Sequence, residues 1–517
     1  MRIGVDVGGT NTDAVVMDGN KVLAGKKAPT TANVSDGIVA AIGAVLEESG
    51  VAAAEVRSVM IGTTHFTNAF VERKNLLPVG IIRIALPSSR GVLPLTDWPA
   101  DLSHAVGAEH FLVKGGYQYD GRVADELDET AVGNAAREIR QKRLRSVAIT
   151  GLFSPVNAEM ERRAEEIVRN EAPDVAVTLS SRIGRIGILE RENAAVMNAS
   201  LSELSTRVVQ SFREALARLD VAAPFFVSQN DGTLMSADYV EKYPVLTFAS
   251  GPTNSMRGAA YLSGLKAALI ADIGGTTTDI GVLVNGFPRE SSLTVDVGGV
   301  RTNFRMPDVL ALGLGGGSLV RATDAGVEVG PTSMGYRLAQ QAMVFGGDTL
   351  SATDLAVAAG YADVGDPTLV SGIPAGVVDE GIARIHQKVT AGVDRMKTSA
   401  EPLPLVLVGG GSILIREDIP GTSETIVPEH AGVANAIGAS IAQVSGETDR
   451  IFAYDATGRE QAMETAKQEA HTRAVEAGAE PDTIQILDVE ELPLAYMPGG
   501  AVRIRVKVAG ELAGSGA

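Results

Sequence analysis

A short D-x-G-G-T-x-T-D pattern occurs twice in this chain, once near its start and once in its second half. The first copy is Asp6–Asp13 and the second is Asp272–Asp279. Each copy follows a short apolar run and precedes another, which predicts a strand, a glycine turn and a second strand. Two copies so far apart predict two related domains that face one ligand.

The residue types in these turns predict a site for phosphate groups. A pair of glycines lets the backbone adopt positive φ and approach a ligand closely, and consecutive N–H groups in such a turn bind anions. Threonine hydroxyls add further hydrogen-bond donors. The predicted nucleotide-binding residues of the two turns are Gly8, Gly9, Thr10, Asn11, Thr12, Gly274, Gly275, Thr276 and Thr277.

An aspartate stands at the end of the first strand in each copy. Asp6 and Asp272 are the predicted metal ligands and catalytic carboxylates, because Mg²⁺ prefers oxygen ligands and keeps several of its waters. Asp13 and Asp279 close the turns, where aspartate also commonly hydrogen-bonds backbone amides, so a functional and a structural role both stay open for them. A lone turn of this kind is often only a hairpin, whereas the matching pair favours a nucleotide site.

Six motifs resemble, in the same order, those of the hydantoinase A/5-oxoprolinase family. They are Gly4–Asp13, Ile61–Ala69, Ser250–Pro252, Asp272–Asp279, Gly313–Ser318 and Val427–Val433. The paired turns also resemble the two phosphate loops of the superfamily that holds acetate and sugar kinases, actin and heat-shock chaperone ATPases. The resemblance implies an α/β fold with two actin-like ATPase (ribonuclease H-like) domains around a nucleotide cleft, and a small C-terminal α+β appendix follows them. We expect these three parts at residues 1–187, 188–448 and 449–517.

In the superfamily, a glycine loop after a buried strand holds the adenosine part of the nucleotide. The corresponding residues here are Gly409, Gly410, Gly411 and Ser412, although a tight turn before a helix is the alternative. Gly313–Ser318 resembles a family motif whose flexible glycines, if they lie near phosphate, would suit lid closure. A mobile surface loop is the alternative for that segment.

A threonine-rich segment resembling a family motif follows the strand expected at Val56–Gly62. Thr64 matches this motif and is a predicted catalytic residue. His65 stands where the family usually has an apolar or small residue, so it is either a substrate-specific catalytic contact or a harmless surface variant. Three arginines are candidates for binding a substrate carboxylate, with a solvated helix edge as the alternative: Arg182, Arg185 and Arg191.

The resemblance implies ATP-dependent hydrolysis of a cyclic amide, such as a hydantoin or a 5-oxoproline-like lactam. ATP, with Mg²⁺, phosphorylates the amide oxygen, and water then opens the ring. A B-type half or subunit normally accompanies the A-type part, and this sequence lacks one, so we expect a separate partner subunit or altered chemistry. Two alternatives stay open: a small-molecule kinase or carboxylase component, and a nucleotide-switched, chaperone-like reactivating factor.

Composition narrows the classes of partner and the compartment. The net charge of −18 argues against a nucleic-acid partner, because no basic excess exists to neutralise phosphates. The absence of cysteine excludes disulfides, thiolate metal sites and iron–sulfur clusters. The sequence shows neither a signal peptide nor an apolar run of about 20 residues, so we expect a cytoplasmic protein without a membrane span. Formation of a homo-oligomer is left open.

Local patterns predict several further elements. Ile81–Trp98 contains two prolines and is expected to be irregular, whereas Ile188–Leu219 is expected to be a long helical stretch that bridges the two halves. Pro224–Val227 is an expected early strand of the second domain. Val433–Val444 is an expected helix of small residues.

Overall fold

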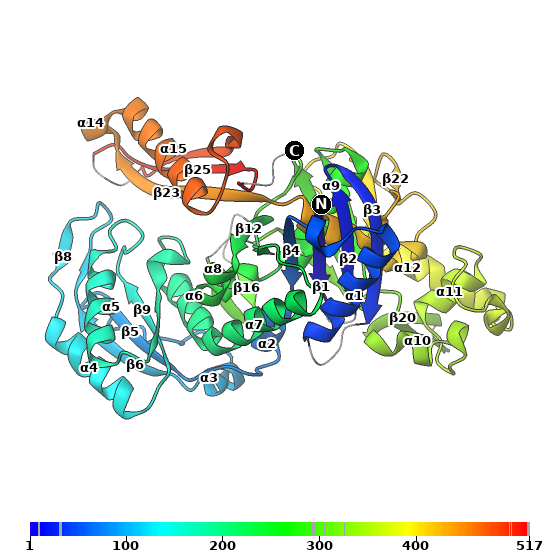
Figure 1. The fold of residues 1–517 in the computed structure, drawn as a ribbon, viewed down its shortest axis with the longest axis horizontal. Helices are drawn as coiled ribbons and strands as arrows, with labels where there is room; N and C mark the ends of the chain where they lie inside the picture. Colours follow the sequence, from blue (N-terminus) through cyan, green and yellow to red (C-terminus); the bar gives the residue numbers. More distant parts are fainter. Residues whose placement is uncertain are drawn as a thin grey trace.

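The structure of the chain is a computed structural model, and it shows an α/β protein with mixed sheets (Figure 1). The residues that it describes are 1–8, 11–29, 34–291, 295–303, 306–324, 326–495, 497 and 499–513. Three larger sheets, of nine, four and six strands, carry the architecture. Among the helices so described, none combines the length and the apolar character needed to cross a membrane.

The nine-stranded sheet begins with the first D-x-G-G-T-x-T-D copy. In chain order, its first strands are β1 (Arg2–Val7), β2 (Asn11–Asp18), β3 (Lys21–Pro29) and β4 (Ser58–Thr63). Strand β2 is buried on both faces, because Ala14 and Val16 pack toward helix α1 (Val34–Ser49) while Val15 and Met17 pack toward helix α13 (Ala434–Ser440). Strand β4 runs parallel to β1, which brings a distant segment beside the first turn.

The six-stranded sheet repeats this arrangement around the second copy. Its strands are β13 (Ala268–Ile273), β14 (Thr278–Val284), β15 (Phe287–Pro288), β18 (Val309–Leu312), β21 (Leu405–Val408) and β22 (Thr425–Ile426). Strand β13 pairs antiparallel with β14 and parallel with β21, as β1 does with β2 and β4. Helix α12 (Ala375–Met396) covers one face and helix α9 (Ser250–Ser263) the other.

Four parallel strands form a separate lobe on the left of Figure 1. They are β5 (Val79–Leu86), β6 (Glu109–Lys114), β9 (Ser146–Gly151) and β10 (Ala176–Leu179), with α4 (Glu129–Gln141) and α5 (Glu159–Glu171) packed on them. The expectation of irregular structure over Ile81–Trp98 is therefore wrong for its first residues. The apolar run of β5 is long enough to form a buried strand, and Pro87 interrupts the chain only after that strand has ended.

One further local prediction is confirmed, and another needs correction. The long helical stretch expected at Ile188–Leu219 is present as two helices, α6 (Ile188–Ser200) and α7 (Ser202–Arg218), which meet at Leu201. The strand expected at Pro224–Val227 is β11 (Phe225–Ser228), and it joins the first sheet because it pairs in parallel with β4. The division of the chain after residues 187 and 448 stays a prediction.

The C-terminal residues extend the nine-stranded sheet. The helix expected at Val433–Val444 is wrong at its end, because β23 (Gln443–Ala453) begins there and pairs with β12 (Thr233–Ser236). Strands β25 (Ala501–Gly510) and β24 (Gln485–Pro493) follow β23 outward. Helix α15 (Arg459–Glu476) covers one face with alanines at every fourth position: Ala462, Ala466, Ala470 and Ala474. Such small side chains let a helix approach a sheet closely.

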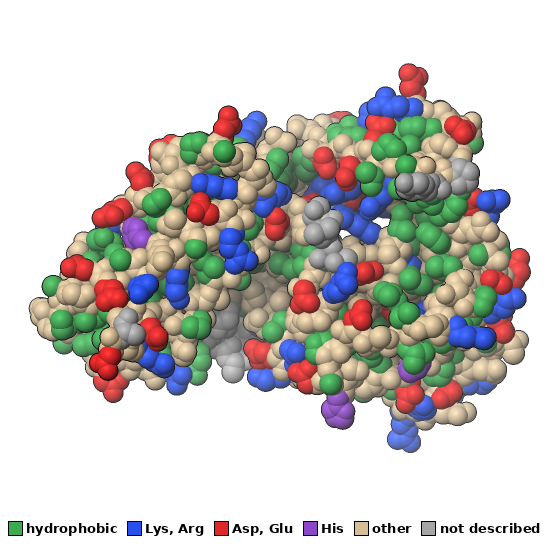
Figure 2. Space-filling model, turned by 180° about the vertical axis from the view of Figure 1, so that it is seen from behind, with side chains coloured by type: hydrophobic (Ala, Val, Ile, Leu, Met, Phe, Trp, Pro, Cys, Tyr) green, Lys and Arg blue, Asp and Glu red, His purple; other side chains and the backbone are tan. Residues whose placement is uncertain are grey.

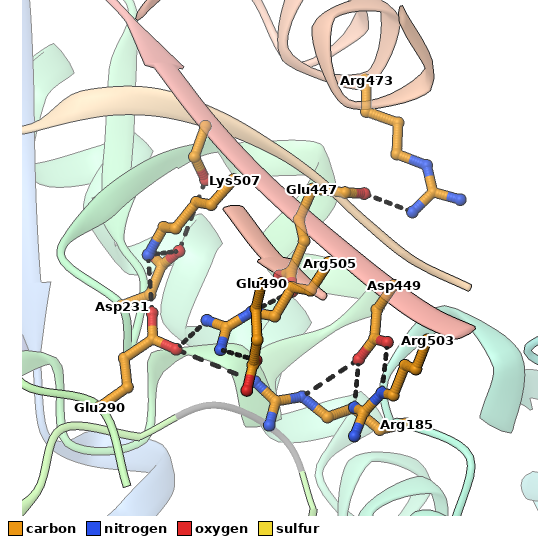
Figure 3. Close-up of polar contacts among 11 residues, drawn as sticks. Arg185, Asp231, Glu290, Glu447, Asp449, Arg473, Glu490, Arg503, Arg505 and Lys507 are labelled. Carbon is orange, nitrogen blue, oxygen red and sulfur yellow. Dashed lines mark hydrogen bonds and ion pairs between the residues drawn. The ribbon is translucent and has the colours of Figure 1, made fainter. Parts of the chain in front are cut away.

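Ion pairs join this C-terminal unit to the rest of the molecule (Figure 3). Arg503, Arg505 and Lys507 alternate along β25, so their side chains share one face of the sheet. Lys507 Nζ lies 3.0 Å from Asp231 Oδ2 and 2.9 Å from Glu290 Oε1. Figure 2 shows a hollow beneath the unit, seen from behind, where charged side chains of both signs gather. The unit is therefore attached by buried charges as well as by strand pairing.

Candidate functional site

Strand pairing places two aspartates side by side at each turn. Asp6 lies opposite Asp13 across β1 and β2, and Asp272 lies opposite Asp279 across β13 and β14. The two copies also form the same backbone hydrogen bond: Gly8 N donates to Asn11 O at 3.0 Å, and Gly274 N donates to Thr277 O at 2.9 Å. The sequence repeat is thus a repeat of turn geometry.

Electrostatic repulsion between the aspartates of the two turns indicates that they form one acidic centre. Burial, followed by the charges of Asp13 and Asp272, raises the pKa of Asp6 to about 7. Burial also raises the pKa of Asp272, and burial with the charge of Asp272 raises that of Asp279 to about 7. Lys27 opposes this effect, since its Nζ pairs with Asp13 Oδ2 at 2.7 Å. Clustered carboxylates of this kind favour binding of a cation or a proton.

The predicted metal ligands fit a divalent cation. Asp6 Oδ1 and Asp13 Oδ1 are buried and accept no hydrogen bond from any described residue. Beside Asp6 lies Gly62 of β4, where an added Cβ would overlap Asp6 Oδ1, and beside Asp272 lies Gly409, where a Cβ would overlap Asp272 Oδ1. Each carboxylate therefore borders a space that only a glycine leaves open.

The described residues contain no ready-made metal cage. No group of three or more histidine, aspartate or glutamate side chains among them is arranged to hold a metal ion by itself. Mg²⁺ commonly binds through one or two carboxylates, several waters and the phosphates of a substrate. The acidic centre would thus hold Mg²⁺ together with a nucleotide through Asp6 and Asp272.

Residues of the predicted phosphate turns differ in their exposure to solvent. Asn11, Thr276 and Thr277 are exposed and available to a ligand, Gly8, Gly274 and Gly275 are partly buried, and Thr12 is buried beneath the first turn. Gly9 and Thr10 lie outside the described residues. The turns thus present at least part of the predicted set to a ligand.

A glycine strip packs directly on the second turn. Gly316 N donates to Gly274 O at 3.0 Å, and Gly317 N donates to Gly275 O at 2.7 Å. A Cβ at Gly315 would lie 2.6 Å from the backbone N of Thr276. Most of the segment Gly313–Ser318 is buried, so a mobile surface loop is not what the structure shows.

The predicted adenosine loop also adjoins the second turn. Gly409 has φ 84°, and a Cβ at Gly411 would lie 2.8 Å from Gly274 O. Gly410 is exposed, whereas Gly411 and Ser412 are buried in a short 3₁₀ helix, Gly410–Leu414. The loop, the strip and the second turn therefore lie in one place, although they come from distant parts of the chain.

Thr64 and His65 lie beside the first turn. Thr64 N donates to Val7 O at 3.3 Å, which ties this segment to the end of β1. Thr63 Oγ1 and His65 Nδ1 are hydrogen-bonded at 2.7 Å, and burial lowers the pKa of His65. His65 is therefore a neutral, partly buried side chain at neutral pH, and its catalytic role stays a prediction.

The three arginine candidates have different surroundings. Arg191 is fully buried, and its guanidinium donates to the carbonyl oxygens of Arg185 at 2.8 Å and of Ile186 at 2.7 Å. It is neither a solvated helix edge nor free to bind a substrate. Arg185 joins the ion pairs beneath the C-terminal unit, where its Nε lies 3.7 Å from Asp449 Oδ2. Arg182 keeps both interpretations.

Two crossing helices hold the aspartates, and sequence reasoning missed their polar residues. On α9, Ser255 Oγ donates to Asp272 Oδ2 at 2.5 Å, and on α13, Asn435 Nδ2 donates to Asp6 Oδ2 at 2.9 Å. A Cβ at Gly258 would overlap Ala434 O, and one at Gly438 would overlap the backbone of α9. The Ser-Gly-Pro start of α9 and the small residues of α13 are recognisable in the sequence. Only the crossing of the two helices in the structure shows that their polar residues contact Asp272 and Asp6.

Comparison with known proteins agrees with this arrangement of motifs. Residues 2–172 match the hydantoinase/oxoprolinase N-terminal region, and residues 191–366 match the hydantoinase/oxoprolinase family. The chain is 28% identical over 396 residues to the acetophenone carboxylase gamma subunit of Aromatoleum aromaticum, covering 69% of this chain and 53% of that one. It is also 28% identical over 396 residues to the caprolactamase subunit alpha of Pseudomonas jessenii, covering 72% of this chain and 56% of that one. The chain thus spans about half the length of these curated relatives.

Solved structures share the fold. The ATP-dependent caprolactamase from Pseudomonas jessenii superposes with a TM-score of 0.78 and 21% identity, over 99% of this chain and 88% of that one. Nucleotide-free acetone carboxylase superposes with a TM-score of 0.68 and 19% identity, again over 99% and 88%. The two matched regions, which cover more than half of the chain, establish that it belongs to the hydantoinase/oxoprolinase family.

Proposed function

We propose that this chain is the nucleotide-using subunit of an ATP- and Mg²⁺-dependent enzyme that opens a cyclic amide. The observation that carries the proposal is the single acidic centre made by Asp6 and Asp272, each near the end of a strand that leads into a glycine turn. Two matching halves that meet at one centre are typical of actin-like ATPases, and this is the fold we assign to the two halves. Relatives named as a caprolactamase and as carboxylase subunits support an ATP-dependent reaction.

The residues of the two turns would orient ATP for attack at its terminal phosphate. Backbone N–H groups and the exposed Thr276 and Thr277 hydroxyls can donate to phosphate oxygens. Asp6 and Asp272 would hold Mg²⁺, which when bound neutralises charge on the transferring phosphoryl group. Phosphoryl transfer depends mainly on such positioning and charge stabilisation, so the absence of a strong nucleophile in this set is no obstacle.

The chemistry we propose balances as a coupled hydrolysis. The amide oxygen attacks the γ-phosphorus, the bond to the ADP oxygen breaks, and ADP leaves with that electron pair. Water then adds to the activated carbon, the C–N bond breaks, the nitrogen takes a proton, and an acyl phosphate remains. A second water hydrolyses this acyl phosphate, so one lactam and two waters give ADP, phosphate and one carboxylate with its amine. Hydantoins and 5-oxoproline-like lactams are the substrate class that we propose.

A carboxylase component is the second candidate. The relatives named as acetophenone carboxylase gamma subunit and acetone carboxylase support it, since phosphorylation of an oxygen can activate a ketone or bicarbonate as well as an amide. These relatives and the caprolactamase alpha chain are named as subunits, which supports a partner subunit for this chain as well.

Nucleotide binding and phosphate release test the proposal together. Melting temperature is measured with and without Mg·ATP, and phosphate release is followed with hydantoin, 5-oxoproline and caprolactam, and separately with ketones and bicarbonate. A rise in melting temperature, with phosphate release stimulated by a lactam, supports the amidohydrolase. Stimulation only by a ketone with bicarbonate favours the carboxylase. If Mg·ATP leaves the melting temperature of the wild type unchanged, as it does those of Asp6→Asn and Asp272→Asn, the proposed nucleotide site is overturned.

A further inference from the structure

Asn254 is a buried polar residue without an assigned role. It lies on α9, is 0% exposed, and neither its Nδ2 nor its Oδ1 has a hydrogen-bond partner among the described residues. Buried side-chain amides nearly always find partners in native proteins, and an exception calls for an ordered water or ion. The side chain of Asn254 is therefore expected to hydrogen-bond a group that the protein alone does not supply.

The group that faces Asn254 is the Asp6 carboxylate. A Cβ added at Gly62 would overlap Asp6 Oδ1 and would lie 2.5 Å from Asn254 Nδ2, so both polar atoms border the same point. Gly62 lies directly opposite Asp6 in the pairing of β1 with β4. Because Gly62 has no side chain, a small space stays open between Asp6 Oδ1 and Asn254 Nδ2, two atoms without a hydrogen-bond partner among the described residues.

The backbone around Asn254 is held rigidly in this position. Its carbonyl oxygen lies against Gly438 of α13, where any Cβ would overlap it. The next residue, Ser255, donates to Asp272, and Asn435 of α13 donates to the other Asp6 oxygen. Asn254 and Ser255, two consecutive residues of α9, thus lie beside Asp6 and Asp272 respectively. A neutral amide suits this place, because it adds no further negative charge to an acidic centre.

We propose that Asn254 is a positioning residue of the metal site, whose side-chain amide holds a water of the Mg²⁺ hydration shell against Asp6. The inference rests on the proposed nucleotide site and adds a neutral residue to its two carboxylates. Mg²⁺ retains several waters when it binds proteins, so groups that orient those waters contribute to its affinity. A buried water with no connection to the metal is the competing occupant, and the test separates the two.

The test is a Mg²⁺ titration of the full chain at a fixed, saturating concentration of ADP, read as melting temperature. ADP avoids turnover, so the readout is binding and not activity. For Asn254→Ala we expect the Mg²⁺ concentration at half-maximal stabilisation to rise at least fivefold, with the shift by metal-free ADP unchanged. Asn254→Ser is expected to behave in the same way and serves if the alanine variant does not fold.

Asn198→Ala is the matched control. Asn198 is 1% exposed and lies on α6, where its Nδ2 donates to Thr178 Oγ1 at 3.0 Å and to Lys242 O at 2.8 Å. Its loss should lower the melting temperature of the free protein and leave the Mg²⁺ midpoint unchanged. A rise of less than fivefold in the Asn254 variant, while wild type still responds to Mg·ADP, overturns the inference and assigns a structural water. If wild type itself shows no nucleotide response, the proposed function fails and this inference fails with it.

Discussion

Asn435 donates a hydrogen bond of 2.9 Å to the Asp6 carboxylate, although 429 residues separate the two in the sequence. Helix α13, which carries Asn435, is short and made of small residues, so it fits between β1 and α9. The contact connects the first turn with the last part of the predicted nucleotide core. Several measurable consequences depend on this geometry.

Asn435→Ala should make Mg²⁺ binding more sensitive to pH. The hydrogen bond from Asn435 lowers the pKa of Asp6, so its loss lets protons compete more strongly with the metal. We expect the thermal stabilisation by Mg·ADP to fall to roughly half at pH 7 and to recover toward pH 9. Equal pH profiles for this variant and wild type would show that the bond does not tune the carboxylate.

Asp6→Asn should stabilise the ligand-free protein at pH 8 but not at pH 4. The pKa of Asp6 rises from 3.8 to about 7 on folding. A raised pKa means that the stability contributed by the protonated form is present at low pH and is lost as pH rises from about 4 to about 7. A permanently neutral side chain avoids this loss, and we expect a gain on the order of 2 kcal/mol in the free energy of unfolding at pH 8.

Asp101→Asn is the control for this pH effect. A hydrogen bond from the Arg73 side chain lowers the pKa of Asp101, which is the opposite direction. Urea unfolding at pH 4 and pH 8 measures both variants. The interpretation of Asp6 fails if its variant loses stability at pH 8, or gains as much at pH 4 as at pH 8.

Gly438→Ala should destabilise the protein through the helix crossing. Its Cβ would overlap the backbone carbonyl of Asn254, which cannot move as a flexible side chain would. Overpacking of this kind costs about 1–3 kcal/mol, occasionally more. Gly376→Ala, on helix α12 with open space at the Cβ position, should instead be neutral or slightly stabilising. Equal melting temperatures for the two variants would mean that α9 and α13 do not pack so closely.

Lys507→Met should loosen the C-terminal unit. The Lys507 side chain is 6% exposed and pairs with both Asp231 and Glu290, so the substitution leaves two partly buried carboxylates without this cation. Breaking a fully buried ion pair typically costs about 3–5 kcal/mol, and we expect a smaller cost here because Glu290 also pairs with Arg505. Limited proteolysis should then cut between β23 and β25 earlier than in wild type, and the free energy of unfolding should fall.

Arg459→Met is the comparison for the C-terminal ion pairs. Arg459 pairs with Glu491 at the surface, where solvent screens the charges and such pairs contribute little. Its substitution should leave proteolysis and unfolding nearly unchanged. A Lys507→Met variant as resistant to protease as Arg459→Met would show that strand pairing alone holds the unit.

Much of the fold was predictable from local sequence patterns. The apolar runs around Asp6 and Asp272 predicted the paired strands, and strand–turn–strand units formed at both places. Helix α11 (Ala352–Ala358) also starts with a local pattern, because Ser351 is its N-cap and Asp354 completes a capping box. The prediction of irregular structure from Ile81 onward was wrong for its first residues, because the prolines lie beyond the end of β5 and the local signal did not show where that strand ends.

Local patterns could not reveal which distant groups meet at the site. The repeat identified the two turns, because glycine, threonine and aspartate have their effects within a few residues of one another. Asn254 and Asn435 carry no such local signal, because the sequence around an asparagine in a helix of small residues does not indicate what that helix packs against. The sequence alone therefore predicted the turns and the family, whereas the crossing of α9 and α13 decided which polar groups surround Asp6, because burial and pairing depend on packing between segments hundreds of residues apart.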